Sequence, residues 1–172
     1  MYYLAYGSNL HPHRLTLRIP SARHIGNVAL PGFRLSFDKR SRDASAKCMF
    51  TETGSLDDVL HGAVYRLAPD EKPVLDEIEG LGSGYDEKQI SVTVDGALYE
   101  TFLYTAAKTH VDKSLLPYDW YKELVILGAA FHRFPDAYIG RIAAVPTMPD
   151  PDVDRVQRIQ KLLDNMRPTD QG

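Results

Sequence analysis

The first ten residues join an apolar strand pattern to a run of turn residues. Residues 2–6 are aromatic or apolar, which suits a half-buried strand, and Gly7-Ser8-Asn9 follow directly. We expect Gly7 to supply a positive φ angle and a close backbone approach, and His11-Pro12 to open a helix that runs to about Arg18. A strand, a tight loop and a helix start would aim backbone N–H groups at one point, which suits a carboxylate or a developing oxyanion. An ordinary strand-to-helix turn is the alternative.

The next part of the chain is dominated by strand patterns. Extended or alternating patterns predict strands over residues 24–37, 47–53, 59–67, 85–94 and 98–105. Pro31-Gly32 interrupts the first of these, which indicates a bend or a bulge. We interpret residues 47–53 and 59–67 as one hairpin, and Asp95-Gly96 as the turn of another. Residues 38–43 are charged and are expected to form a loop that is either solvated or touches a substrate.

Apolar residues at helical spacing predict four more helices. They cover residues 70–79, 118–132, 136–144 and 153–166. In the first of them Asp70 is a cap candidate, and Gly80 ends the helix. Its apolar face would consist of Val74, Leu75 and Ile78. Strands at hairpin spacing, with helices between and after them, indicate an α+β fold whose antiparallel or mixed sheet closes on itself.

The length of 172 residues suits one domain with a core of its own. We expect this domain over residues 1–145. Residues 146–172 would then form a proline-rich linker and a helix that docks on the same domain or on a second subunit. Residues 167–172 are expected to fray.

Composition and charge narrow the classes of protein to consider. Cys48 is the only cysteine, so no internal disulfide can form, and a reducing compartment fits best. No secretory pattern and no run of about eighteen apolar residues occurs, so we expect a cytoplasmic protein with no membrane partner. The net charge of −3 offers no general attraction for nucleic acid. Residues 1–50 nevertheless carry +6 and the remainder −9. This favours an anionic small substrate near Gly7, unless the arginines are simply solvated.

Other catalytic and binding schemes find little support. Ser8 does not lie in a Gly-x-Ser-x-Gly nucleophile elbow, and Cys48 within a strand pattern is expected to be a small buried side chain. His11 and His13 have no third ligand beside them, so no metal site is expected. No phosphate loop or dinucleotide motif occurs, and we expect no cofactor.

Glu79 is an acidic residue at an electrostatically unfavourable position. It borders the predicted apolar face and lies in the last turn of its helix, where the helix dipole disfavours a negative charge. Asp76 lies three residues back and would add a like charge. A carboxyl group that is reluctant to ionise suits general acid–base chemistry, although Asp-Glu-Ile-Glu before glycine is also an ordinary acidic helix end.

Three segments, in this order, resemble the gamma-glutamylcyclotransferase superfamily with its AIG2-like, butirosin-cyclotransferase-like fold. They are Tyr6-Gly7-Ser8-Asn9-Leu10, then Leu75-Asp-Glu-Ile-Glu79-Gly80 with Ser83-Gly84-Tyr85, and last residues 121–129, so the likeness spans about residues 2–130. The resemblance implies a small distorted β-barrel with short helices around it, to which periodicity adds a C-terminal helix. Residues 80–85 are one residue shorter than the family pattern, and residues 38–47 have no clear match. The resemblance therefore leaves the identity of the substrate open.

The resemblance also implies an intramolecular acyl transfer on a gamma-glutamyl amino acid, peptide or amine. The free α-amine of the glutamyl group would attack its own side-chain amide and release pyroglutamate and an amine. Glu79 would be the general acid and base, as the second acid of the family motif. The implied substrate-binding residues are Tyr3, Leu4, Ala5, Tyr6, Gly7, Ser8 and Tyr121, with Asn9 capping the first helix or orienting the loop.

The enzyme would belong to the amide-cleaving lyases or acyltransferases, need no partner beyond its small substrate, and be a monomer or a homodimer. The alternative is a domain on the same scaffold that binds an anionic metabolite and has lost or changed the reaction.

Overall fold

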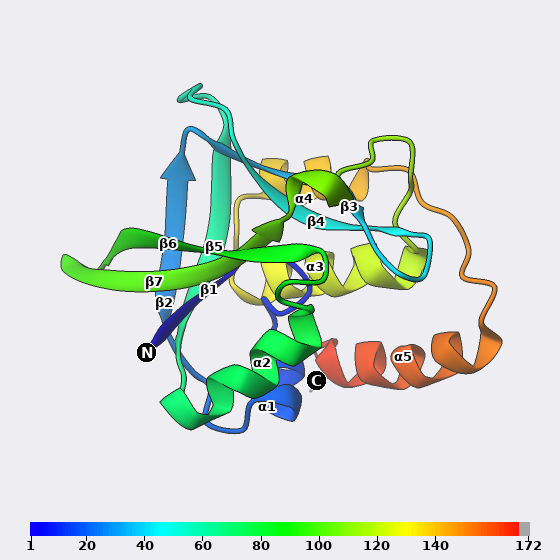
Figure 1. Cartoon of the computed structure of the whole chain (residues 1–172), viewed down its shortest axis with the longest axis horizontal. Helices are drawn as coiled ribbons and strands as arrows, with labels where there is room; N and C mark the ends of the chain where they lie inside the picture. Colours follow the sequence, from blue (N-terminus) through cyan, green and yellow to red (C-terminus); the bar gives the residue numbers. More distant parts are fainter. Residues whose placement is uncertain (169–172) are drawn as a thin grey trace.

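The computed structural model describes residues 1–168, which form a layered arrangement of strands and helices (Figure 1). The strands are β1 (Tyr2–Ala5), β2 (Arg23–Pro31), β3 (Phe33–Arg40), β4 (Ala46–Glu52), β5 (Val59–Arg66), β6 (Tyr85–Val94) and β7 (Ala97–Ala106). The α-helices are α1 (Pro12–Arg18), α2 (Lys72–Glu79), α3 (Asp119–Phe131), α4 (Asp136–Ala143) and α5 (Val153–Met166), with short 3₁₀ turns η1 (Pro69–Glu71) and η2 (Lys108–His110).

A five-stranded sheet in the order β2-β5-β1-β7-β6 carries the short first strand at its centre. Strands β1 and β7 are parallel and the other neighbours are antiparallel, so the sheet is mixed. Strands β3 and β4 form a separate antiparallel pair. The predicted α+β class, the mixed sheet and the C-terminal helix are therefore confirmed.

The predicted closure into a barrel is wrong. Within residues 1–168, strands β2 and β6 remain at the two edges of the sheet with no ladder between them. The edges do meet through side chains, because a Cβ on Gly26 of β2 would lie only 2.2 Å from Cγ1 of Val94 on β6. The register of β2 against β5 also shifts between His24 and Gly26. Packing therefore brings the two edges together where backbone hydrogen bonds do not.

The pairing of β4 corrects a second prediction. Strand β4 pairs with β3, as Leu35 opposite Phe50 shows, while β5 lies between β2 and β1. Residues 47–53 and 59–67 thus form two strands but no hairpin. The break at Pro31-Gly32 is where the chain leaves the main sheet for the second one, with Gly32 at a φ of 86°.

The charged segment over residues 38–43 is only partly a loop. Its first three residues continue β3, and Lys39 lies on the same side of the strand as Phe37, each 7% exposed. The register of β3 against β4 shifts between Ser36 and Lys39, so the strand is irregular at this point. Of the two alternatives for this segment, full solvation does not hold for Lys39, which is buried.

Local signals predicted the second hairpin and the end of α2 correctly. Strands β6 and β7 pair along their full length, and Asp95 and Gly96 have φ values of 48° and 83°, as a tight hairpin turn requires. Gly80 ends α2 in the left-handed conformation, with φ 73°.

The start and the apolar face of α2 differ from the prediction. Asp70 does not cap the helix, because the 3₁₀ turn η1 leads into it. Of the predicted apolar face, only Leu75 is buried, while Val74 is 47% and Ile78 41% exposed. The helix contacts the core along a single narrow stripe, so the residues on either side of Leu75 stay accessible.

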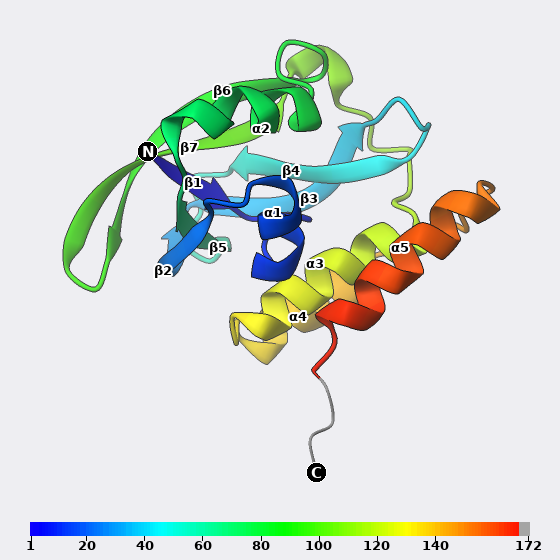
Figure 2. The ribbon, with the colours of Figure 1, turned by 90° about the horizontal axis from the view of Figure 1, so that it is seen from below.

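Helix α5 lies alongside α3, as Figure 2 shows. Leu163 and Met166 of α5 pack against Leu124 of α3 in an apolar cluster distinct from the main core. Of the segment expected to fray, residues 169–172 lie outside the described residues. The division into a domain over residues 1–145 and a tail stays a prediction. No helix in the described part of the chain has the length and apolar character needed to span a bilayer.

A buried imidazole ties the end of α3 to the loop that follows β1. Nε2 of His132 lies 2.8 Å from the Leu10 carbonyl oxygen and 3.0 Å from the Tyr65 hydroxyl. A carbonyl oxygen only accepts, so Nε2 carries the proton in that bond. Burial lowers the pKa of His132 to about 4, and the positive potential of nearby His24 acts in the same direction.

We therefore expect the chain to lose stability as the pH falls below about 6.5. In that range the unfolded chain protonates this imidazole, whereas the folded chain resists protonation until about pH 4. The expected loss attributable to His132 is about 1–2 kcal/mol between about pH 7 and about pH 5. Urea unfolding of the wild type and of His132→Gln, which keeps a donor but does not titrate, measures it. Equal losses in both proteins would rule out His132 as the cause.

Candidate active site

A small cavity lies where six elements of the fold, β1, β4, α2, β6, β7 and α3, meet the loop after β1. Its volume is about 20 Å³, enough for roughly one water molecule. It is lined by Tyr3, Tyr6, Gly7, Ser8, Asn9, Cys48, Glu79, Tyr85, Tyr104 and Tyr121. The loop over residues 7–9 and Glu79 at the end of α2 thus share one cavity, although Asn9 and Glu79 are 70 positions apart in sequence.

One oxygen of the Glu79 carboxylate is held by two donors. Oε1 accepts a hydrogen bond from Nδ2 of Asn9 at 2.8 Å and lies 3.3 Å from Nη1 of Arg18. The same Arg18 nitrogen donates to Oδ1 of Asn9 at 2.9 Å, which closes a three-residue ring of polar contacts. Within residues 1–168, Oε2 of Glu79 accepts no hydrogen bond. The side chain is thus fixed through one oxygen while the other remains available for proton transfer.

Asn9 and Asp76 have roles that differ from the predicted ones. Asn9 does not cap the first helix, because His11 does so through Nδ1, which accepts from the His13 N–H at 3.2 Å. Asn9 instead orients the carboxylate. Asp76 does not confront Glu79 as an unpaired like charge, because Lys72 Nζ lies 2.7 Å from its Oδ1 and the Tyr104 hydroxyl donates to the same oxygen at 2.5 Å.

Gly7 allows the loop to approach β4 closely. A Cβ at this position would lie 2.9 Å from Cβ and 3.3 Å from Sγ of Cys48, closer than a side chain can be accommodated. The expected positive φ is not found, since Gly7 is not in the left-handed conformation. Glycine is required here by space alone.

Tyrosines form most of the cavity wall and stay neutral. The Tyr121 hydroxyl accepts from the Cys48 N–H at 3.0 Å, and its own proton is within reach of the Cys48 thiol. The Tyr85 hydroxyl donates to the Cys48 carbonyl at 3.2 Å. Burial raises the pKa of both phenols well above the ordinary value, and it raises the pKa of the Cys48 thiol to about 12. The cavity therefore offers neutral hydrogen-bond donors and no thiolate nucleophile.

A larger cavity of about 210 Å³ opens onto the small one. The two share Ser8, Glu79, Tyr85 and Tyr121 in their walls. The larger cavity adds four cationic side chains, namely Arg14, Arg18, Lys39 and Lys47. Four of the eight basic side chains in residues 1–50 thus line the cavity that contains Glu79, where they favour an anionic ligand.

The residues predicted for the site divide into two groups. Tyr3, Tyr6, Gly7, Ser8, Asn9, Glu79 and Tyr121 line the small cavity. Leu4 and Ala5 are completely buried in the core and line neither of the two cavities within the described chain. Their contribution is to fix the strand from which the loop emerges.

Sequence reasoning missed several residues of the site. Arg14 and Arg18 lie four residues apart on α1. This spacing puts both side chains on one face of the helix and is the signal by which the pair could have been found. Lys39 follows an irregularity in the pairing of β3 with β4, which no sequence pattern indicated. Tyr85 was noticed only as part of a motif, and Tyr104 only as a strand aromatic.

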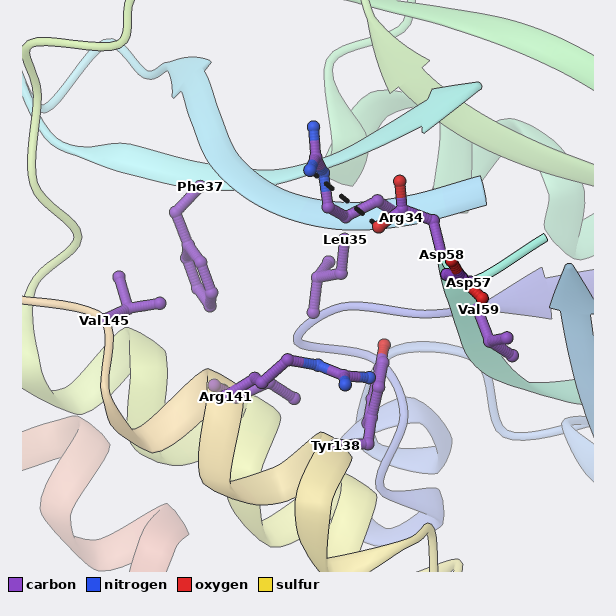
Figure 3. Close-up of a pocket in the computed structure, with 10 residues that line it drawn as sticks. Arg34, Leu35, Phe37, Asp57, Asp58, Val59, Tyr138, Arg141 and Val145 are labelled. Carbon is purple, nitrogen blue, oxygen red and sulfur yellow. Dashed lines mark ion pairs between the residues drawn. The ribbon is translucent and has the colours of Figure 1, made fainter. Parts of the chain in front are cut away.

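A third cavity, of about 320 Å³, is separate from the other two (Figure 3). It lies between β3 and α4, with Leu35 and Phe37 on one side and Tyr138 and Arg141 on the other. Arg34 at its rim pairs with Asp58 at 3.8 Å. It shares no lining residue with the cavities that contain Glu79.

Comparison with known proteins identifies relatives of this chain. The family model described as gamma-glutamyl cyclotransferase, AIG2-like, matches residues 3–123. Gamma-glutamylcyclotransferase of Mus musculus is 31% identical over 148 residues, and that of Homo sapiens 30%, in each case over 83% of this chain and 77% of the relative. A solved structure of a gamma-glutamyl cyclotransferase has a TM-score of 0.80 at 25% identity, covering 96% of this chain and 98% of its own. An uncharacterized protein from Homo sapiens has a TM-score of 0.79 at 26% identity, with 95% and 97% covered.

Proposed function

The chain belongs to the AIG2-like gamma-glutamyl cyclotransferase family, and on that premise we propose that it releases pyroglutamate from a gamma-glutamyl amino acid, peptide or amine. One observation carries the proposal. The Glu79 carboxylate and the Gly7-Ser8 backbone line the same small cavity, beside a larger cavity rich in cations. An acid–base group, a set of neutral donors and an anion-binding region thus stand together where such a reaction needs them.

In the proposed reaction the substrate supplies its own nucleophile. Glu79 takes a proton from the glutamyl α-ammonium, and the resulting amine attacks the side-chain amide carbonyl of the same residue. A carbon–nitrogen bond forms within a five-membered ring, and the bond to the leaving nitrogen breaks. Glu79 passes that proton to the leaving nitrogen. The attacking nitrogen loses a second proton as it becomes the lactam nitrogen, and this proton passes to the released amine, which departs as an ammonium. No water is consumed, and the Glu79 carboxylate is regenerated. The high effective concentration of an intramolecular amine replaces a protein nucleophile.

The remaining side chains position the reactants and stabilise the intermediate. Asn9 and Arg18 hold Oε1 of Glu79, so that Oε2 is the oxygen that exchanges the proton. Backbone N–H groups at Gly7 and Ser8, with the hydroxyl of Tyr121, are the proposed donors to the tetrahedral oxyanion. Neutral phenols suit this role because they donate without adding charge.

The direct test is incubation of the purified chain with a panel of gamma-glutamyl amino acids, peptides and amines. We expect pyroglutamate and the free amine to appear in equal amounts, measured by chromatography. The second candidate function, a binding domain on the same scaffold, is kept because the cation-rich cavity alone can bind an anion. A binder would raise the melting temperature in the presence of one of these compounds without forming product.

A further inference from the structure

The third cavity, between β3 and α4, takes no part in the proposed reaction. Its volume of about 320 Å³ exceeds that of either cavity that contains Glu79. Pockets that bind small molecules have volumes of about 300–1,000 Å³, so this cavity lies at the lower end of that range. Side chains of β3 and α4 face each other across it (Figure 3). Its size and its two walls therefore suit a small ligand.

Most of the wall of this cavity is apolar. Leu35 and Phe37 point from β3 into the space beside α4 (Figure 3). Phe37, Tyr138 and Ile142 are buried, so packing fixes this part of the wall. Water against such a wall finds few hydrogen-bond partners, and a ligand gains affinity when its apolar part displaces that water. The cavity thus favours a ligand with an apolar or aromatic body.

Four charged side chains line the cavity, and two of them neutralise each other. Arg34 pairs with Asp58, and Asp57 lies at the same end of the cavity as that pair (Figure 3). Asp57 and Arg141 are exposed, and within residues 1–168 neither makes a hydrogen bond or an ion pair.

Of these two unpaired groups, Arg141 is the one that lies against the aromatic wall. Its side chain runs along α4 toward Tyr138, and its guanidinium carbon lies 5.7 Å from the centre of the Tyr138 ring (Figure 3). A planar guanidinium beside an aromatic ring is held in place while its N–H donors stay available. An anionic group on a ligand beside this wall would therefore meet Arg141.

We propose that the third cavity binds a small amphipathic carboxylate. The apolar or aromatic body of the ligand lies between Leu35 and α4, and its carboxylate accepts hydrogen bonds from the Arg141 guanidinium. Binding at this site does not depend on pyroglutamate release, because its lining residues all differ from those of the cavities that contain Glu79.

The test is a titration of the isotope-labelled full chain with phenylpropionate, phenylpropanol and phenylpropylamine, followed through the amide chemical shifts. The three compounds share one body and differ in the charge of the head group. We expect phenylpropionate to bind about fivefold or more tightly than the alcohol, the effect of a charge-assisted hydrogen bond at an exposed arginine. The amine should bind no more tightly than the alcohol. The shift changes should gather in residues 34–37 and 138–145.

Three variants attribute the preference to one side chain. Arg141→Met should lower the affinity for phenylpropionate to near that for the alcohol, and should change the affinity for the alcohol by less than about twofold. Arg141→Lys keeps the charge and should retain part of the preference. Arg158→Met is the matched control for net charge. Arg158 is an exposed residue of α5 that makes no ion pair within the described residues, so its loss should leave all three affinities unchanged.

The cation-rich cavity beside Glu79 is the rival site for the same carboxylate, and Lys39→Met separates the two. Lys39 lines that cavity and not the third one. Unchanged binding in Lys39→Met, with loss in Arg141→Met, would support the third cavity. Loss in Lys39→Met alone, with shift changes around Ser8 and Glu79, would overturn the inference.

Two other results would also overturn it. One is an affinity for phenylpropionate no greater than that for the alcohol or the amine, because the cavity would then not select a carboxylate. The other is the absence of binding by all three compounds at millimolar concentration. The proposed function is judged separately by pyroglutamate release, so failure of the one is distinguishable from failure of the other.

Discussion

Glu79→Gln is expected to lower kcat for pyroglutamate release by about 10²- to 10⁴-fold, the range that a positioned general acid and base contributes. The fold should be unaffected, because glutamine has the same shape and its amide oxygen can still accept from Asn9 and Arg18. What is lost is the ability of Oε2 to take and return a proton. KM should change much less than kcat, since proton transfer contributes to the transition state and not to substrate binding.

The matched control for this prediction is Glu77→Gln. Glu77 lies on the same helix but is exposed, and within residues 1–168 its side chain makes no hydrogen bond or ion pair. It should keep full activity, and circular dichroism should show both variants folded. A Glu79→Gln protein that retains more than a tenth of the wild-type kcat would remove Glu79 from the mechanism.

The features predicted correctly from the sequence were those encoded over a few residues. Asp95-Gly96 favours a hairpin turn through its own backbone preferences, and Gly80 ends α2 because glycine tolerates the left-handed conformation. The pairing of β4 is not encoded locally in the sequence, because it depends on which strand lies nearest in the folded chain. A turn-like segment between two strands suggested a hairpin, but the chain instead crosses from one sheet to the other.

Barrel closure failed for a related reason. The two edges of the sheet contact each other through Gly26 and Val94, which are far apart in sequence and meet only in the folded chain. Glycine at position 26 leaves room for the Val94 side chain, and no local sequence pattern predicts this contact. Periodicity could predict the strands but not their final neighbours.

In the candidate site too, residues marked by local signals were predicted, and residues brought there by tertiary packing were not. The loop over residues 7–9 and Glu79 were marked by motif and by helix position, and the two do share a cavity. Arg14 and Lys39 were not predicted, because a long charged side chain is normally solvated, and only tertiary packing reveals that it is buried. Arg18 was seen merely as the end of α1, whereas its contact with Glu79 spans sixty-one positions of the chain.

The packing of α3 against the loop leads to a second large effect, which concerns stability. Gly128→Ala is expected to destabilise the fold by about 1–3 kcal/mol, the usual cost of overpacking a filled site. A Cβ at this position would lie 2.5 Å from Cβ of Leu10 and 3.0 Å from the backbone nitrogen of His11. These atoms belong to backbone or are fixed to it, so no flexible side-chain end can move aside. The segment that directly follows the Gly7–Asn9 loop must shift instead, and we expect kcat/KM to fall by about tenfold or more.

Gly140→Ala is the matched control because it makes the same change inside another helix. Within the described chain, a Cβ on Gly140 of α4 would meet no atom within 4 Å, so only the helix preference for alanine acts. That preference should stabilise the protein by about 0.5–1 kcal/mol and leave activity unchanged. Urea unfolding should therefore give opposite signs for the two glycine-to-alanine changes. If Gly128→Ala were as stable as Gly140→Ala, the loop would not be held by α3, and the position of Asn9 beside Glu79 would need another explanation.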